Sequence, residues 1–191
     1  MINAERILLA VEKRLDHEVS LVIYGRAAIA LGFHGAPEAV TKTLDVDAII
    51  RASELETFRR DTNFWDAQEA ANRELEKEGL YITHLFEADQ VFLRRNWEQQ
   101  IVPITRPATR WLRLFRPATL DLILTKMMRG DDPQDMADAA FLIRHDGITP
   151  AQIESAFVEA VIPDLAELRD AFERAKPRVL QLARDAAVGK C

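Results

Sequence analysis

The chain contains a single cysteine, Cys191, among its 191 residues, so no intramolecular disulfide can cross-link it. It also has no apolar run close to the roughly 18 residues that a membrane-spanning helix needs. Its first residues, Met-Ile-Asn-Ala-Glu-Arg, lack the basic-then-apolar layout of a signal peptide. We therefore expect a cytoplasmic protein with no membrane partner. Cys191 is expected to be an unreactive residue of the C-terminal tail.

Internal repeats, low-complexity tracts and Gly/Ser linkers are also absent, which at this length favours one domain or one domain with a small appendage. What is present is typical of a globular protein: 48% hydrophobic and 29% charged residues. The net charge of −6 is uneven, because residues 91–130 carry eight basic side chains and two acidic ones. Most of the eight are arginines, whose planar fork fits phosphate. They either pair with the acidic remainder of the surface or face phosphate or RNA.

The first motif joins an apolar run to a helix through a glycine. Residues 19–24 are rich in β-branched and aromatic side chains and predict a buried strand. Gly25 interrupts this run, and helical spacing resumes over residues 27–33. A glycine turn at the start of a helix exposes backbone N–H groups that can hold phosphate.

The second motif places two carboxylates inside an apolar run. Residues 44–50 predict a strand in which Asp45 and Asp47 share one face, because side chains alternate along a strand. Two neighbouring carboxylates repel each other unless a cation joins them. Magnesium suits such a pair, since it takes hard oxygen ligands and often also the phosphates of a bound nucleotide.

The remaining pattern predicts an α+β protein. The expected helices and strands before Pro117 are a helix from Ala4 to about His17, a helix starting at a Ser53–Glu56 capping box, a helix over 66–78 ended by Gly79, and strands over 80–86, 90–93, 101–104 and 111–115. After it, helices are expected over 118–129, 134–145, 151–160 and 164–187. We therefore expect an α/β core with a mixed sheet over residues 1–116, and a helical part over 117–191 packed on it.

These motifs resemble a known superfamily. Gly25-Arg26, followed by Lys42-Thr43-Leu44-Asp45-Val46-Asp47, is similar to the nucleotidyltransferases that include DNA polymerase β. The similarity is closest to small bacterial proteins related to the abortive-infection toxins of AbiEii type. A second block, residues 120–130 followed by 134–138, resembles the family's helix with a nucleotide-contacting lysine and a following helix with an acidic pair.

The resemblance implies a nucleotidyltransferase-like sheet flanked by helices and a role for each matching residue. Asp45 and Asp47 would be the catalytic carboxylates that bind Mg²⁺. The nucleotide would be held by Gly25, Arg26, Thr43, Lys126 and Asp135, with Lys126 and Asp138 also counted as catalytic. Acidic side chains at the start of a helix are favoured by its dipole in any case, so a structural role for the acidic pair stays open.

The implied function is a magnesium-dependent transfer of a nucleotide from a nucleoside triphosphate to a hydroxyl of RNA, such as tRNA, or of a protein. The resemblance also implies a toxin with a cognate antitoxin as its partner. Two departures keep an alternative open: Arg26 stands where the family has a small residue, and a third carboxylate is not evident. Arg26 either contacts phosphate or fills the site. The alternative is a nucleotidyltransferase fold retained as a binding or regulatory module.

Overall fold

The computed structural model describes residues 1–189, apart from the side chain of His84, so Cys191 lies outside the described residues. The chain forms two compact units. Residues 1–87 and 101–116 make unit 1, while residues 88–100 join the part from Pro117 onward in unit 2. The division at residue 116 expected from the sequence and the observed units thus differ for residues 88–100.

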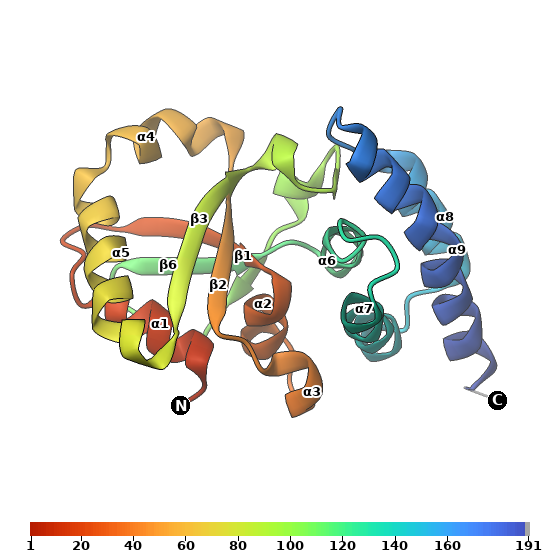
Figure 1. The fold of residues 1–191 in the computed structure, drawn as a ribbon, viewed down its shortest axis with the longest axis horizontal. Coiled ribbons are helices and arrows are strands. Elements are labelled where there is room, and N and C mark those ends of the chain that lie inside the picture. The colour runs from red at the N-terminus through yellow and green to blue at the C-terminus, as the bar shows by residue number, and fades with distance from the viewer. Residues whose placement is uncertain (190–191) are drawn as a thin grey trace. The chain divides into compact units, whose positions relative to one another are not determined.

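Unit 1 is built on a five-stranded mixed sheet with the order β3-β2-β1-β6-β5 (Figure 1). Its strands are β1 (Val19–Tyr24), β2 (Asp45–Ile50), β3 (Tyr81–Glu87), β5 (Val102–Ile104) and β6 (Leu112–Arg116). Strand β1 runs antiparallel to β2 and parallel to β6, and β2 runs parallel to β3. Strands β1 and β2 therefore lie inside the sheet, and β3 forms one edge.

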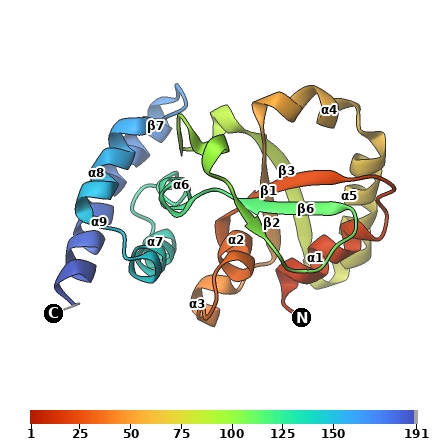
Figure 2. The ribbon, with the colours of Figure 1, turned by 180° about the vertical axis from the view of Figure 1, so that it is seen from behind.

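The helices of unit 1 are α1 (Asn3–Glu12), α2 (Gly25–Gly32), α3 (Glu38–Thr41), α4 (Leu55–Arg60) and α5 (Thr62–Leu75). Helices α1 and α2 contact β2, and α5 contacts β3 and α1. Figure 2 shows the same layer of helices and strands from behind. The apolar side chains between these helices and the sheet, such as Ile7, Ile23 and Val46, are completely buried. Their burial is the main driving force for this layer to form.

Unit 2 contains α6 (Thr119–Thr125), α7 (Pro133–Asp146), α8 (Pro150–Glu159) and α9 (Ala166–Val188), with the short strands β4 (Leu93–Arg94) and β7 (Ala160–Val161) paired antiparallel. Helix α9 contacts α7 and α8. The Phe172 ring meets those of Phe92 and Phe157 edge-on, at centroid distances of 5.6 and 5.7 Å. This aromatic cluster places Phe92, from the segment of residues 88–100, in the core of unit 2.

A buried ion pair also connects residues 88–100 to the rest of unit 2. Arg94 and Asp121 form two side-chain hydrogen bonds of 3.1 and 2.8 Å, and the Arg94 backbone N–H donates to the same carboxylate at 2.8 Å. The Asp121 hydrogen bonds raise the pKa of the Arg94 guanidinium. Sequence spacing could not reveal this pairing, because 27 residues separate the two.

The expected α+β class, with a mixed sheet flanked by helices and a helical C-terminal part, is confirmed. A helix does begin near Ser53–Glu56, as expected, but the capping box predicted there is wrong. Ala52–Glu54 form a 3-10 turn, α4 starts at Leu55, and none of the described side chains caps its first turn. The expected strand at 90–93 is also largely wrong, since Ala88–Gln90 form a 3-10 turn and only β4 follows. No helix within residues 1–189 is long and apolar enough to span a membrane.

Candidate functional site

The turn between β1 and α2 depends on Gly25. Its φ is +66°, a left-handed conformation that side chains with a Cβ rarely adopt. A Cβ built on Gly25 would lie 3.6 Å from Asp47 Oδ2, so the turn and this carboxylate are immediate neighbours. The first backbone N–H groups of α2 therefore start next to Asp47.

Asp45 is oriented by the residue two positions before it. The Thr43 hydroxyl, which is buried, donates to Asp45 Oδ1 at 2.7 Å. The Thr43 carbonyl in turn accepts a hydrogen bond of 2.9 Å from the Asn3 side chain on α1. Thr43, expected to bind nucleotide, thus holds the first carboxylate of the pair in this structure.

Asp47 is held from the neighbouring strand. Thr83 on β3 places its hydroxyl 2.5 Å from Asp47 Oδ1. Asp45 and Asp47 are both half-buried, whereas Val46 and Ala48, which alternate with them, are completely buried. The pair therefore lies on the less buried face of β2.

The negative charges of Asp45 and Asp47 affect the hydroxyl of Tyr24. It is the last residue of β1 and lies opposite Asp47 in the antiparallel register. Burial, together with the negative charges of Asp47 and Asp45, raises the pKa of its hydroxyl. Both carboxylates therefore raise the pKa of the same phenol, so the Tyr24 hydroxyl stays protonated and can donate a hydrogen bond.

Arg26 follows Gly25 and is half-buried. Its Nη1 donates to the carbonyl of Lys42 at 3.4 Å, directly before the segment that carries the two carboxylates. The guanidinium is therefore at the candidate site, where either a phosphate contact or a blocking role is possible by position.

The other residues implied by the resemblance lie together in unit 2. Lys126 Nζ donates to Asp138 Oδ2 at 2.7 Å and to Asp135 Oδ1 at 3.3 Å, and all three side chains are buried. Arg129 Nε adds a 2.6 Å bond to the other oxygen of Asp135. This network joins the end of α6 to the start of α7. A nucleotide-binding or catalytic role for these three residues stays a prediction.

Within residues 1–189, with the side chain of His84 left aside, no three His, Cys, Asp or Glu side chains form a group that could hold a metal ion. Asp45 and Asp47 are two carboxylates with two oriented oxygens, a set that suits a hard cation. Magnesium keeps several waters and commonly takes substrate phosphates as further ligands. The pair therefore fits a metal that arrives together with a nucleotide.

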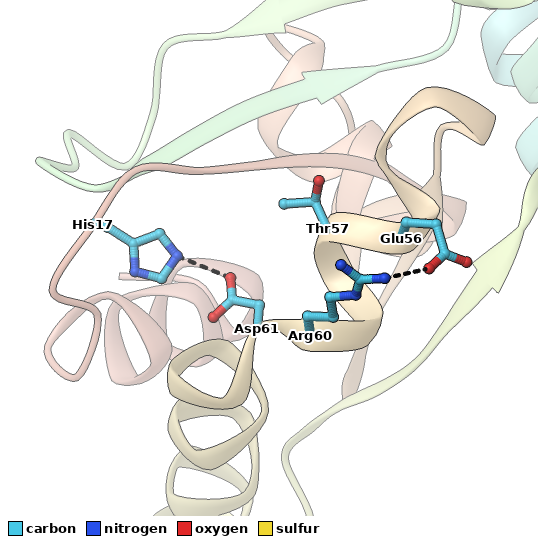
Figure 3. Close-up of a pocket in the computed structure, with 5 residues that line it drawn as sticks. All are labelled: His17, Glu56, Thr57, Arg60 and Asp61. Carbon is cyan, nitrogen blue, oxygen red and sulfur yellow. Dashed lines mark hydrogen bonds and ion pairs between the residues drawn. The ribbon is translucent and has the colours of Figure 1, made fainter.

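Unit 1 also contains an open groove of about 570 Å³, and neither Asp45 nor Asp47 lines it. Figure 3 shows its lining: His17, Glu56, Thr57, Arg60 and Asp61. His17 is 2.9 Å from Asp61, and Arg60 is 3.7 Å from Glu56, so each basic group already faces a carboxylate. The groove has no excess positive charge to attract a triphosphate.

Sequence reasoning missed Thr83 and Tyr24. Threonine and tyrosine are ordinary strand residues, so their residue type does not distinguish them from packing positions. The signal that could have found Tyr24 is its place directly before Gly25, where the strand ends.

The fold and these carboxylates define a class. A mixed sheet carries a glycine turn into a helix on one strand and an Asp-x-Asp pair on the next, as in nucleotidyltransferases. Residues 3–182 match the model of a family described as "Nucleotidyltransferase of unknown function (DUF6036)". The chain belongs to this family, and nucleotidyl transfer is the activity that the family description gives.

No curated protein and no solved structure matches the chain. The expected closeness to AbiEii-type toxins therefore stays a prediction. A nucleotide is the substrate class that membership in this family implies.

Proposed function

We propose that the protein transfers a nucleotide from a nucleoside triphosphate to a hydroxyl group with the help of Mg²⁺. The observation that carries this proposal is the position of Asp47 Oδ2, 3.6 Å from where a Cβ on Gly25 would lie, with Asp45 two residues before it on β2. A cation bound to the pair and phosphates bound to the turn would be direct neighbours.

Each residue has a task that follows from its contacts. Asp45 and Asp47 hold the metal, which supplies positive charge against the triphosphate and the transition state. The N–H groups that follow Gly25 bind phosphate, and the α2 dipole supports them. Tyr24, protonated, donates a hydrogen bond to a phosphate oxygen.

The reaction joins the acceptor oxygen to the α-phosphorus while the bond to the β-phosphate breaks and pyrophosphate leaves. A carboxylate of the pair takes the proton from the attacking hydroxyl. The proposed acceptor is RNA, such as tRNA, or a protein, and the proposed biological role is that of a toxin with a cognate antitoxin. Among the arginines of residues 91–130, Arg94, Arg113 and Arg129 pair with carboxylates, as one of the two alternatives expected. The exposed Arg110 supports an acceptor rich in phosphate.

The test is incubation of the full chain with Mg²⁺, each labelled nucleoside triphosphate, and bulk tRNA. We expect label in the RNA with the wild type and none with Asp45→Asn or Asp47→Asn. Asp66→Asn, at an exposed carboxylate on α5, is the matched control and keeps full activity. Label that persists in both site variants would contradict the proposal.

Substitution of Arg26 distinguishes the proposed enzyme from a binding module that catalyses no transfer. If its guanidinium holds phosphate, Arg26→Ala weakens nucleotide affinity about tenfold or more, since a charge-assisted hydrogen bond contributes roughly 1.5–3 kcal/mol. If it fills the site, Arg26→Ala tightens binding. The measurement is a calorimetric titration with Mg²⁺ and a nucleoside triphosphate. We expect weaker binding, and tighter binding without any label transfer would favour the module.

A further inference from the structure

The contact between β2 and β3 is irregular next to Asp47. Val46 lies opposite Ile82, but Ala48 lies opposite Leu85, so β3 has one residue more than β2 between these two pairs. Such a bulge re-aims a side chain and is common beside functional sites. Here it presents the Thr83 hydroxyl to a carboxylate of the pair.

Thr83 Oγ1 lies 2.5 Å from Asp47 Oδ1 and 3.3 Å from the Val46 carbonyl. A hydroxyl has one proton to donate, and the shorter contact goes to the charged acceptor. The other oxygen, Oδ2, lies on the side of Gly25. The two oxygens of Asp47 therefore have different surroundings.

Helix α5 fixes the backbone that carries Thr83. Gln68 Nε2 donates to the Thr83 carbonyl at 2.5 Å. The Asn72 amide accepts from the Ile82 N–H at 2.8 Å and donates to its carbonyl at 2.9 Å. Because β3 is an edge strand, these amides take the place of a further strand and hold the bulge in one register.

We propose that Thr83 is a positioning residue for Asp47: its hydroxyl holds Oδ1, and Oδ2 is the oxygen that meets the cation beside the Gly25 turn. This inference rests on the function proposed above, because it assumes that Asp47 binds a metal. A group that orients a metal ligand contributes to affinity without touching the metal, and its loss typically costs 10- to 100-fold.

The test uses Mn²⁺ as the probe, titrated into the full chain and followed by electron paramagnetic resonance. Thr83→Val keeps the shape of the side chain and removes the hydroxyl, so we expect about 10- to 100-fold weaker Mn²⁺ binding. Thr83→Ser restores the hydroxyl and the wild-type affinity. Thr109→Val is the matched control, since the Thr109 hydroxyl donates to the Leu112 carbonyl at 2.7 Å, and its affinity stays unchanged.

Thr83→Val with wild-type Mn²⁺ affinity would overturn the inference. If Thr83→Val does not fold, as judged by circular dichroism, the comparison of Thr83→Ala with Thr83→Ser decides, and equal affinities would overturn it as well. The double variant Asp45→Asn/Asp47→Asn distinguishes failure of the positioning role of Thr83 from failure of the proposed metal site. If this double variant loses Mn²⁺ and Thr83→Val retains it, only the positioning role fails. If the wild type binds no Mn²⁺, or the double variant binds it equally well, both proposals fail.

Discussion

At the scale of single residues, His17 shows how a surface contact becomes sensitive to pH. Its Nδ1 is 2.7 Å from Asp16 Oδ1, and its Nε2 is 2.9 Å from Asp61 Oδ2. Asp61 also accepts the Phe64 N–H and caps the start of α5. A neutral imidazole has one N–H and can donate to only one of the two carboxylates, whereas the protonated ring donates to both.

The hydrogen bonds to Asp16 and Asp61 raise the pKa of His17 above its ordinary value of 6.5. The stability that these contacts add is therefore complete below pH 6.5 and is lost as the pH rises through the folded-state pKa. We expect the free energy of unfolding of the wild type to exceed that of His17→Gln at pH 5.5, and the difference to shrink by pH 8.5. Urea unfolding at both pH values measures it, and a difference that grows with pH would contradict this sign.

At the scale of elements, the two ends of helix α2 have different surroundings. At its C-terminal end, the Arg106 guanidinium donates to the carbonyls of Ala30 and Leu31, at 2.5 and 3.4 Å. These contacts satisfy carbonyls that lack a partner within the helix and neutralise the negative end of its dipole. The positive end of the same dipole begins at Gly25, beside Asp47.

Gly25, at the start of α2, and Gly35, in the turn after it, offer a matched comparison. Both have positive φ, +66° and +71°, so alanine at either position costs roughly 1–2 kcal/mol of stability. A Cβ at position 25 makes an ordinary contact with Asp47, and one at position 35 has no described atom within 4 Å. We expect similar losses of stability in denaturant titrations.

Nucleotide affinity should distinguish the two variants. Gly25→Ala places a methyl group at the turn proposed to bind phosphate, so we expect weaker nucleotide binding, while Gly35→Ala leaves the affinity unchanged. Equal affinities in a titration with Mg²⁺ and nucleotide would show that the turn does not bind phosphate.

At the scale of the whole molecule, the chain leaves unit 1 at residue 88 and returns to it at residue 101. Residues 88–100 are held in unit 2 by Arg94, whose guanidinium and backbone N–H both donate hydrogen bonds to Asp121. Next to it, the Arg95 N–H donates to the Glu159 carbonyl at 3.3 Å. Unit 2 therefore includes a segment that comes before the last strand of the unit 1 sheet.

Removing Asp121 should release this segment. Asp121→Ala leaves the Arg94 charge buried without its carboxylate, which costs about 3–5 kcal/mol. We expect a lower free energy of unfolding and faster tryptic cleavage after Arg94 and Arg95, followed by mass spectrometry. The control is Glu18→Ala, which breaks the exposed ion pair with Arg113 and costs about 0–1 kcal/mol. Equal cleavage rates in the two variants would contradict the anchoring role.

The sequence by itself determined the local elements and the motif. The apolar run over Val19–Tyr24 forms β1 with the expected bounds. Gly79 and Gly147 adopt the left-handed conformation at the ends of their helices, and Thr149 caps α8 together with Gln152. These outcomes follow from the burial pattern and from conformational preferences within a few residues, which a sequence displays directly.

Tertiary structure alone decided which distant residues meet. Thr83 reaches Asp47 across 36 positions because β3 pairs with β2 at a bulge, and Arg94 reaches Asp121 across 27. Such outcomes depend on strand register and on the pairing of buried charges, whose energies arise only after the chain has folded, so periodicity and spacing carry no record of them.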